Sequence, residues 1–144
     1  MRGLDSAGRP KTADMTEVLL VDDDPLMREL LAEWLGEAGY RVRQAENGAS
    51  ALQMLHSRPA SLLITDMDMP GRDGAQTLAE ARRMLPGLVV IAISGGNRGG
   101  TQNWASTALK LGAAKALAKP FERQALLAAV KQVLPQEPSG TTRA

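Results

Sequence analysis

The chain has 144 residues, a formal net charge of +1 at pH 7 and a hydrophobic content of 44%. This length suits one domain with its own core, and the near-neutral charge without a basic stripe argues against nucleic acid as a partner. The absence of cysteine excludes disulfides and zinc–thiolate sites. No apolar run approaches the roughly 20 residues that span a bilayer, so we expect a cytoplasmic protein without a membrane partner.

The two ends of the chain differ in character from its centre. Residues 1–14 are rich in small and charged residues and lack hydrophobic periodicity, and residues 136–144 are similarly polar. Such segments bury too little apolar surface to fold. We therefore expect a disordered arm at each end and one domain over residues 15–135.

The central region alternates between two hydrophobic patterns. Short continuous apolar runs indicate strands buried on both faces, and apolar residues at helical spacing indicate amphipathic helices. Five strand–helix units of this kind predict an α/β fold, with a doubly wound parallel sheet of five strands and helices on both faces. In chain order, the expected strands and helices alternate as 18–21, 25–38, 40–45, 49–55, 61–65, 74–84, 88–93, 104–111, 114–118 and 123–134.

Particular residues are expected to begin or end the helices. Asp24 is a predicted cap of the first helix, and Pro25 fits its first turn. The apolar residues assigned to that helix are Leu26, Leu30, Leu31, Trp34 and Leu35. Gly39 and Gly112 are expected to stop the first and fourth helices. The glycine-rich segment 95–100 is expected to be flexible and to be followed by a short or displaced fourth helix.

Acidic residues follow two of the predicted strands. Asp22 and Asp23 come directly after the first strand, and Asp66 and Asp68 come after the third. The carboxyl ends of parallel strands meet at one edge of a sheet, so these acids are expected to lie close together. A bound cation is the simplest way to keep clustered carboxylates ionised. The pattern predicts a hard-metal site with a carboxylate available for phosphate chemistry.

Each of these residues also has a purely structural interpretation. Asp22 and Asp23 can favour the N-terminus of the following helix, and Asp66 and Asp68 can form a turn. Ser94, after the fourth strand, can be an ordinary loop residue. Lys119, after the fifth strand, is more informative, because a lysine at the end of an apolar strand needs an anionic partner.

The joint arrangement resembles the receiver domain of two-component response regulators. The matching motifs are Val21–Pro25, Asp66–Gly74, Ser94 and Lys119–Phe121. They stand in the family's order and at suitable spacing within residues 17–134. The resemblance implies a flavodoxin-like sheet with strand order 2-1-3-4-5.

The resemblance further implies a metal site and a phosphoacceptor. Asp66 would be the phosphoacceptor and a ligand of Mg²⁺, with Mn²⁺ able to substitute. Asp23 would bind the ion directly and Asp22 mostly through water. Asp68 would offer its backbone carbonyl.

Other positions would act on the phosphoryl group and the switch. Ser94 and Lys119 would contact the new phosphoryl group, and Pro120 would follow Lys119 in a cis peptide. The family's aromatic residue three positions before the lysine is replaced by Ala116, so aromatic rotation at that position cannot report the switch. Trp104 is a candidate substitute.

The function implied by the resemblance is that of a signalling phosphoacceptor rather than an enzyme, although it would promote its own phosphorylation and dephosphorylation. A sensor histidine kinase or a histidine phosphotransfer protein would supply the phosphoryl group, and a protein target would read the switched surface. The first helix, near Leu26 to Leu35, and the loop after Lys119 would dock the kinase. With only a short tail after Leu134, a single-domain regulator is expected.

Two alternative functions stay open. The first is a scaffold with the receiver fold that binds its partner without phosphorylation. The second is a phosphohydrolase of the haloacid-dehalogenase type, because Asp66 and Asp68 fit its local motif. Against the second, Pro70 stands where a Thr or Val is usual, and the motif lies in mid-chain. Asp66→Asn distinguishes the scaffold from the phosphoacceptor.

Overall fold

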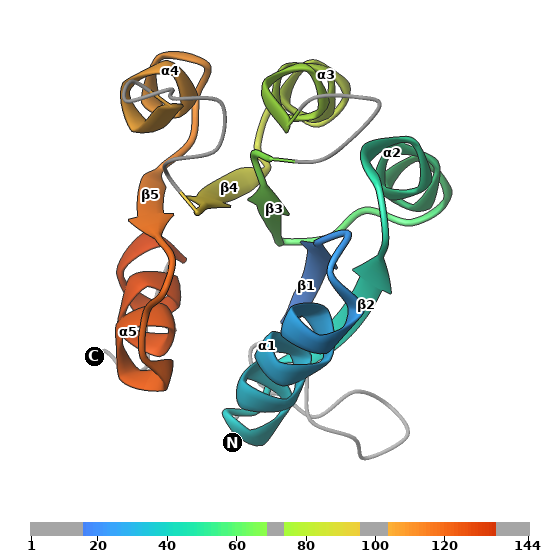
Figure 1. Cartoon of the computed structure of the whole chain (residues 1–144). Coiled ribbons are helices and arrows are strands. Elements are labelled where there is room, and N and C mark those ends of the chain that lie inside the picture. The colour runs from blue at the N-terminus through green and yellow to red at the C-terminus, as the bar shows by residue number, and fades with distance from the viewer. Residues whose placement is uncertain (1–15, 69–73, 96–103, 135–144) are drawn as a thin grey trace, which may run out of the picture.

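The computed structural model of the protein describes residues 16–68, 74–95 and 104–134 (Figure 1). The predicted disordered ends and most of the glycine-rich segment lie outside these residues. Strands and helices alternate through the described parts as predicted. In chain order they are β1 (Glu17–Val21), α1 (Pro25–Glu37), β2 (Arg41–Ala45), α2 (Gly48–Ser57), β3 (Leu62–Asp66), α3 (Gly74–Met84), β4 (Val89–Ser94), α4 (Trp104–Lys110), β5 (Lys115–Ala118) and α5 (Arg123–Val133).

The five strands form one parallel sheet in the order β2-β1-β3-β4-β5. This order confirms the predicted flavodoxin-like arrangement. Helices α1 and α5 cover one face of the sheet, and α2, α3 and α4 cover the other (Figure 1). The carboxyl ends of β1 and β3 are neighbours, because these strands pair directly from Val18 with Leu62 to Val21 with Thr65.

The core consists of two layers of side chains, one on each face of the sheet. Successive side chains of a strand point to opposite faces of the sheet. Leu19 and Val21 therefore pack against α2, α3 and α4, whereas Val18 and Leu20 pack against α1 and α5. All four are fully buried. Burial of both faces explains why β1 appears in the sequence as an uninterrupted apolar run.

The predicted helix boundaries are set by a capping aspartate at the start of α1 and by glycines with positive φ angles after α1 and α4. The Asp24 side chain accepts hydrogen bonds from the backbone N–H groups of Leu26 (3.0 Å) and Met27 (3.4 Å), so it caps α1 as expected. Gly39 and Gly112 have φ angles of 102° and 112°. Only glycine adopts this left-handed conformation without strain, so both residues stop a helix where the sequence predicted.

Leu26 and Leu30 differ from the pattern expected for α1. They are 79% and 40% exposed, whereas Leu31 and Leu35 are fully buried. One residue rotates a helix by about 100°. Leu30 therefore lies about 100° around the helix from Leu31, and Leu26 lies about 140° from it, so both are outside the stripe of Leu31 and Leu35 that faces the sheet. None of the helices in the described ranges is long and apolar enough to cross a membrane.

Gly74 begins α3 in close contact with the chain that leaves β3. A Cβ atom at this position would lie 2.4 Å from Met67 Cα and 2.7 Å from the Asp66 carbonyl oxygen. Both are backbone atoms, so a side chain here has to displace the main chain that carries Asp66. The absence of a side chain at Gly74 thus fixes how closely α3 approaches the end of β3.

We predict that Gly74→Ala lowers the free energy of unfolding by about 1–3 kcal/mol, because an added methyl group overpacks this contact. Urea unfolding followed by circular dichroism measures the change. Gly36→Ala is the matched control, because a Cβ there has nothing within 4 Å. Within α1 this control is expected to raise stability by about 0.5–1 kcal/mol. Equal losses in the two variants would contradict the prediction.

Candidate functional site

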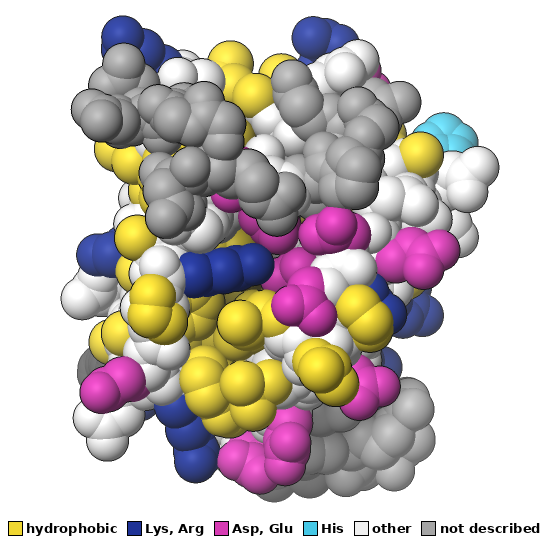
Figure 2. Space-filling model, viewed as in Figure 1, with side chains coloured by type: hydrophobic (Ala, Val, Ile, Leu, Met, Phe, Trp, Pro, Cys, Tyr) yellow, Lys and Arg dark blue, Asp and Glu magenta, His cyan; other side chains and the backbone are white. Residues whose placement is uncertain are grey.

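The carboxyl ends of four strands bring the predicted site residues to one edge of the sheet. Asp22 follows β1, Asp66 ends β3, Ser94 ends β4 and Lys119 follows β5. Acidic side chains gather in the middle of the molecular face shown in Figure 2. The topology therefore assembles groups from four separated segments, as the sequence predicted.

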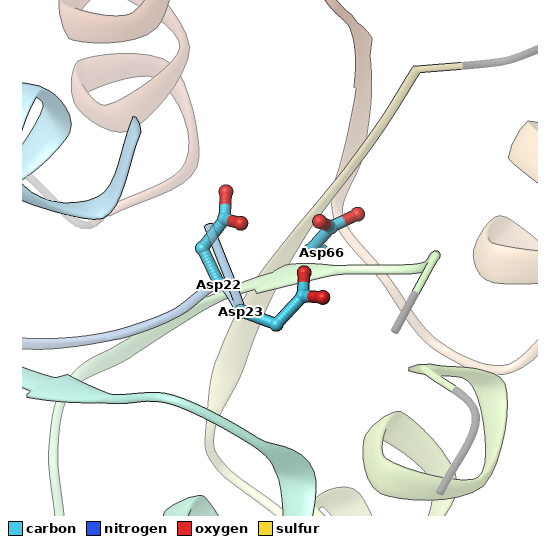
Figure 3. Close-up of side chains that lie close together, drawn as sticks. All are labelled: Asp22, Asp23 and Asp66. Carbon is cyan, nitrogen blue, oxygen red and sulfur yellow. The ribbon is translucent and has the colours of Figure 1, made fainter. Parts of the chain in front are cut away.

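Three carboxylates form a cluster at this edge. Asp22, Asp23 and Asp66 each offer an oxygen, and these oxygens all lie within 4.8 Å of one another (Figure 3). Asp22 is 0% exposed and Asp66 is 3% exposed, while Asp23 is open to solvent. An all-oxygen, carboxylate-rich set with one open side fits a hard divalent cation such as Mg²⁺, which retains several waters.

Lys119 is the cationic partner of the two buried carboxylates. Its Nζ lies 3.1 Å from Asp22 Oδ2 and 3.2 Å from Asp66 Oδ2. Its backbone N–H donates to the Ser94 carbonyl oxygen at 2.8 Å, which fixes the residue beside the end of β4. The anionic partner expected for Lys119 is thus present, and the Lys119–Pro120 peptide bond is cis, as the resemblance implied.

The cluster shifts the titration of both Asp66 and Lys119. Burial raises the pKa of the Asp66 carboxyl from its usual 3.8 to about 6, and the charge of Asp22 adds to this rise. The hydrogen bond from the Asp68 N–H and the charge of Lys119 oppose the rise without cancelling it. Burial alone would lower the pKa of Lys119, but the charges of Asp66 and Asp22 outweigh it and raise this pKa. Lys119 is therefore an ammonium at neutral pH.

Asp68 contacts the site through both its backbone and its side chain. Its N–H donates to Asp66 Oδ1 at 2.9 Å, and its Oδ2 accepts a 2.5 Å hydrogen bond from the Ser94 hydroxyl. The resemblance to receiver domains implied a role for the backbone carbonyl of Asp68 but did not predict this side-chain contact with Ser94. An acid after β3 and a hydroxyl at the end of the adjacent β4 were the signal that could have predicted the side-chain contact.

The three consecutive aspartates divide between two roles. Asp22 and Asp23 join the carboxylate cluster, whereas the Asp24 side chain caps α1. The Asp24 N–H also donates to Asp22 Oδ1 at 2.9 Å, which links the cap to the cluster. The helix-capping interpretation therefore holds for Asp24, whereas Asp22 and Asp23 lie in a cluster that could bind a cation.

Arg28 is a residue of this region that the sequence analysis did not single out. Its Nη1 donates to the Asp22 carbonyl oxygen at 2.7 Å, and its Nε donates to Gln44 Oε1 at 3.2 Å. The side chain thereby ties α1 to the loop after β1. An arginine near the start of a helix carries no local sequence signal for such a contact.

The two positions considered for the switch, Ala116 and Trp104, lie on β5 and at the start of α4. Ala116 lies on β5, an edge strand of the sheet, and pairs with Ala92 of β4. Trp104, at the start of α4, is half-buried and packs against the core layer under α2, α3 and α4. Neither position takes part in the hydrogen bonds and ion pairs of the cluster described above.

A family model, a curated relative and a solved structure all place this chain in the same family. The family model described as the response regulator receiver domain matches residues 18–131. The response regulator receiver protein CpdR of Brucella abortus is 36% identical over 125 residues, which cover 83% of this chain and 98% of CpdR. A crystal structure of a putative response regulator from Chloroflexus aurantiacus aligns with a TM-score of 0.74 and 33% identity, covering 82% of this chain and 96% of that one.

A longer relative contains a similar region. The transcriptional regulatory protein GlrR of Escherichia coli K12 is 36% identical over 124 residues, which cover 86% of this chain but 27% of GlrR. Regions similar to this chain thus occur both as nearly entire proteins and as one part of a longer regulator.

We predict that Asp66→Asn is more stable than the wild type in metal-free buffer at pH 8, by up to about 3 kcal/mol. The raised pKa means that the folded protein binds this proton more tightly than the unfolded chain. The wild type therefore loses stability as pH rises from about 4 through about 6, and Asn at this position removes that loss. Urea unfolding at a series of pH values with EDTA measures the difference.

Two controls accompany this measurement. Glu33→Gln removes an exposed carboxylate of α1 but keeps Asp66, so it should retain the wild-type loss of stability through the same pH range. Millimolar Mg²⁺ should stabilise the wild type at pH 8 more than Asp66→Asn, because a cation that binds only the folded state shifts the equilibrium. A pH-independent difference between wild type and Asp66→Asn would contradict the assigned burial effect.

Proposed function

Because the chain belongs to the response regulator receiver family, we propose that it accepts a phosphoryl group from a phosphohistidine onto Asp66 and thereby switches a partner-binding surface. The observation that carries the proposal is the buried Asp66 carboxylate, with an ammonium 3.2 Å away and two further carboxylates beside it. A nucleophile, a fixed positive charge and ligands for a cation are the groups that phosphoryl transfer requires.

In the proposed reaction, an Asp66 carboxylate oxygen forms a bond to phosphorus as the bond between phosphorus and the imidazole nitrogen breaks. The imidazole leaves with that electron pair and takes up a proton from solvent. The product is an acyl phosphate. Negative charge spreads over the phosphoryl oxygens during transfer, so cations at fixed positions lower the barrier.

The residues of the cluster would hold Mg²⁺ in this reaction. Asp23 and Asp66 would bind it through carboxylate oxygens, Asp22 mostly through water and Asp68 through its backbone carbonyl. Bound Mg²⁺ would supply positive charge against the phosphoryl oxygens. A cation here would also favour the ionised, nucleophilic form of Asp66, whose pKa burial raises to about 6.

Lys119 and Ser94 would stabilise the product. Lys119 would exchange a carboxylate partner for a phosphoryl oxygen, and Ser94 would donate its hydroxyl to another. The hydrogen bond from Lys119 N–H to the Ser94 carbonyl joins the two residues through the main chain. With Ala116 in place of an aromatic residue, we propose that the switch acts through movement of these strand ends.

The proposed source of the phosphoryl group is a sensor histidine kinase or a histidine phosphotransfer protein. Support comes from exposed leucines on α1, the helix that follows the carboxylates of β1. Leu26 and Leu30 are 79% and 40% exposed, and Figure 2 shows hydrophobic side chains next to the acidic group on this face. An apolar patch beside charged chemistry is typical of a protein-docking surface.

We predict that the wild type gains one phosphoryl group when incubated with Mg²⁺ and acetyl phosphate, and that Asp66→Asn does not. Intact mass spectrometry measures the gain, which EDTA should abolish because the carboxylate cluster needs the cation. Glu33→Gln, with an exposed carboxylate removed from α1, should gain the group like the wild type.

The alternative functions predict other outcomes. A scaffold with the receiver fold would show no gain in either protein and would retain its partner in Asp66→Asn. The family match gives no support to a phosphohydrolase of the haloacid-dehalogenase type. Absence of phosphorylation by acetyl phosphate and by a panel of phosphorylated histidine phosphotransfer domains would contradict the proposed function.

We predict that Leu26→Ser slows phosphoryl transfer from a phosphorylated histidine phosphotransfer domain by about tenfold, which corresponds to loss of an apolar interface anchor. Its phosphorylation by acetyl phosphate should be unchanged, because this donor does not need the docking surface. Leu109→Ser is the matched control, because this leucine is 49% exposed on α4. Equal slowing in the two variants would contradict a docking role for α1.

A further inference from the structure

Ser94 has one hydroxyl proton to donate, and in this structure an acid already accepts it. The Ser94 Oγ donates to Asp68 Oδ2 at 2.5 Å. Ser94 is 1% exposed, so water cannot easily replace that acceptor. A hydrogen bond to a charged carboxylate is also stronger than one between neutral groups. Any new acceptor of this proton has to compete with Asp68.

Asp68 is held in place by bonds that do not involve its own side chain. Its N–H donates to Asp66 Oδ1 at 2.9 Å, and the preceding Met67 N–H donates to the Ile93 carbonyl oxygen at 2.7 Å. The second bond joins the chain after β3 to the strand that ends in Ser94. The carboxylate of Asp68 and the hydroxyl of Ser94 therefore face each other across a fixed pair of strand ends.

We propose that the Asp68 carboxylate is a positioning residue that retains the Ser94 hydroxyl in the unphosphorylated protein and so opposes the switch. This inference rests on the proposed function, in which Ser94 donates to the phosphoryl group on Asp66. One proton cannot serve both acceptors, so phosphorylation has to break the bond between Ser94 and Asp68. The Asp68 side chain sets the balance between the two arrangements, separately from any role of its backbone carbonyl.

The test compares the affinity for beryllofluoride, a phosphoryl mimic, in the wild type, Asp68→Ala, Ser94→Ala and the double variant, all with Mg²⁺. Titration calorimetry measures each affinity, and urea unfolding confirms that each variant folds. Asp68→Ala is expected to bind at least about tenfold more tightly, because a competing charged hydrogen bond is gone. In the Ser94→Ala background, Asp68→Ala should give no such gain.

The double variant separates this mechanism from simple charge repulsion. Removing a negative charge near the phosphoryl site would improve binding equally with or without the Ser94 hydroxyl. Asp68→Asn keeps an acceptor oxygen but loses the charge, so its Ser94-dependent gain should be smaller than that of Asp68→Ala. No gain in Asp68→Ala, or equal gains in the two backgrounds, would overturn the inference.

Failure of the inference and failure of the proposed function have different signatures. If the wild type binds beryllofluoride but the gain does not depend on Ser94, the role of Asp68 is wrong and the proposed function stands. If none of the four proteins binds beryllofluoride or gains a phosphoryl group, the proposed function is wrong and the inference falls with it.

Discussion

The ion pairs between one lysine and two buried aspartates are the interaction on which the organisation of this protein depends. Lys119 is separated from Asp66 by 53 residues and from Asp22 by 97, yet it contacts both carboxylates. Two carboxylates removed from water repel each other and lose hydration, and the ammonium offsets part of both costs, which leaves the pKa of Asp66 raised. Asp22 and Asp66 lie at the ends of the neighbouring strands β1 and β3, whereas Lys119 follows β5, which β4 separates from β3. The ion pairs therefore need the long lysine side chain as well as the observed strand order.

The sequence predicted the fold closely because its strongest signals come from burial. β1, β3 and β4 are nearly fully buried on both faces, so each appears as an apolar run. Asp22, Asp66 and Ser94 were predictable for a related reason, since polar residues at the ends of such runs have to lie at the sheet edge. Lys119 follows the less buried β5, and a lysine that needs an anionic partner was its signal.

Features that depend on how a helix is rotated about its axis, or on which rotamer a side chain adopts, were not predictable. Helical spacing did not reveal that Leu26 and Leu30 point to solvent, because a broad apolar pattern does not fix which part of it faces the sheet. The bond between Ser94 and Asp68 links residues that are 26 positions apart, and the contact of Arg28 with the Asp22 carbonyl joins a helix to the loop before it. Such contacts follow from rotamer choice after the backbone has formed.

The hydrogen bonds around Asp24 affect the entropy that is lost when a partner protein binds to α1. Asp24 N–H binds the Asp22 carboxylate, and the Asp24 carboxylate binds the Leu26 N–H. These two hydrogen bonds connect the buried Asp22 to Leu26, the most exposed leucine of α1. The distance between Asp22 and Leu26 is therefore fixed when the protein folds. A protein that packs on Leu26 binds a surface whose position relative to the carboxylates is already fixed. The conformational entropy of that alignment is lost before the partner arrives and does not weaken its binding.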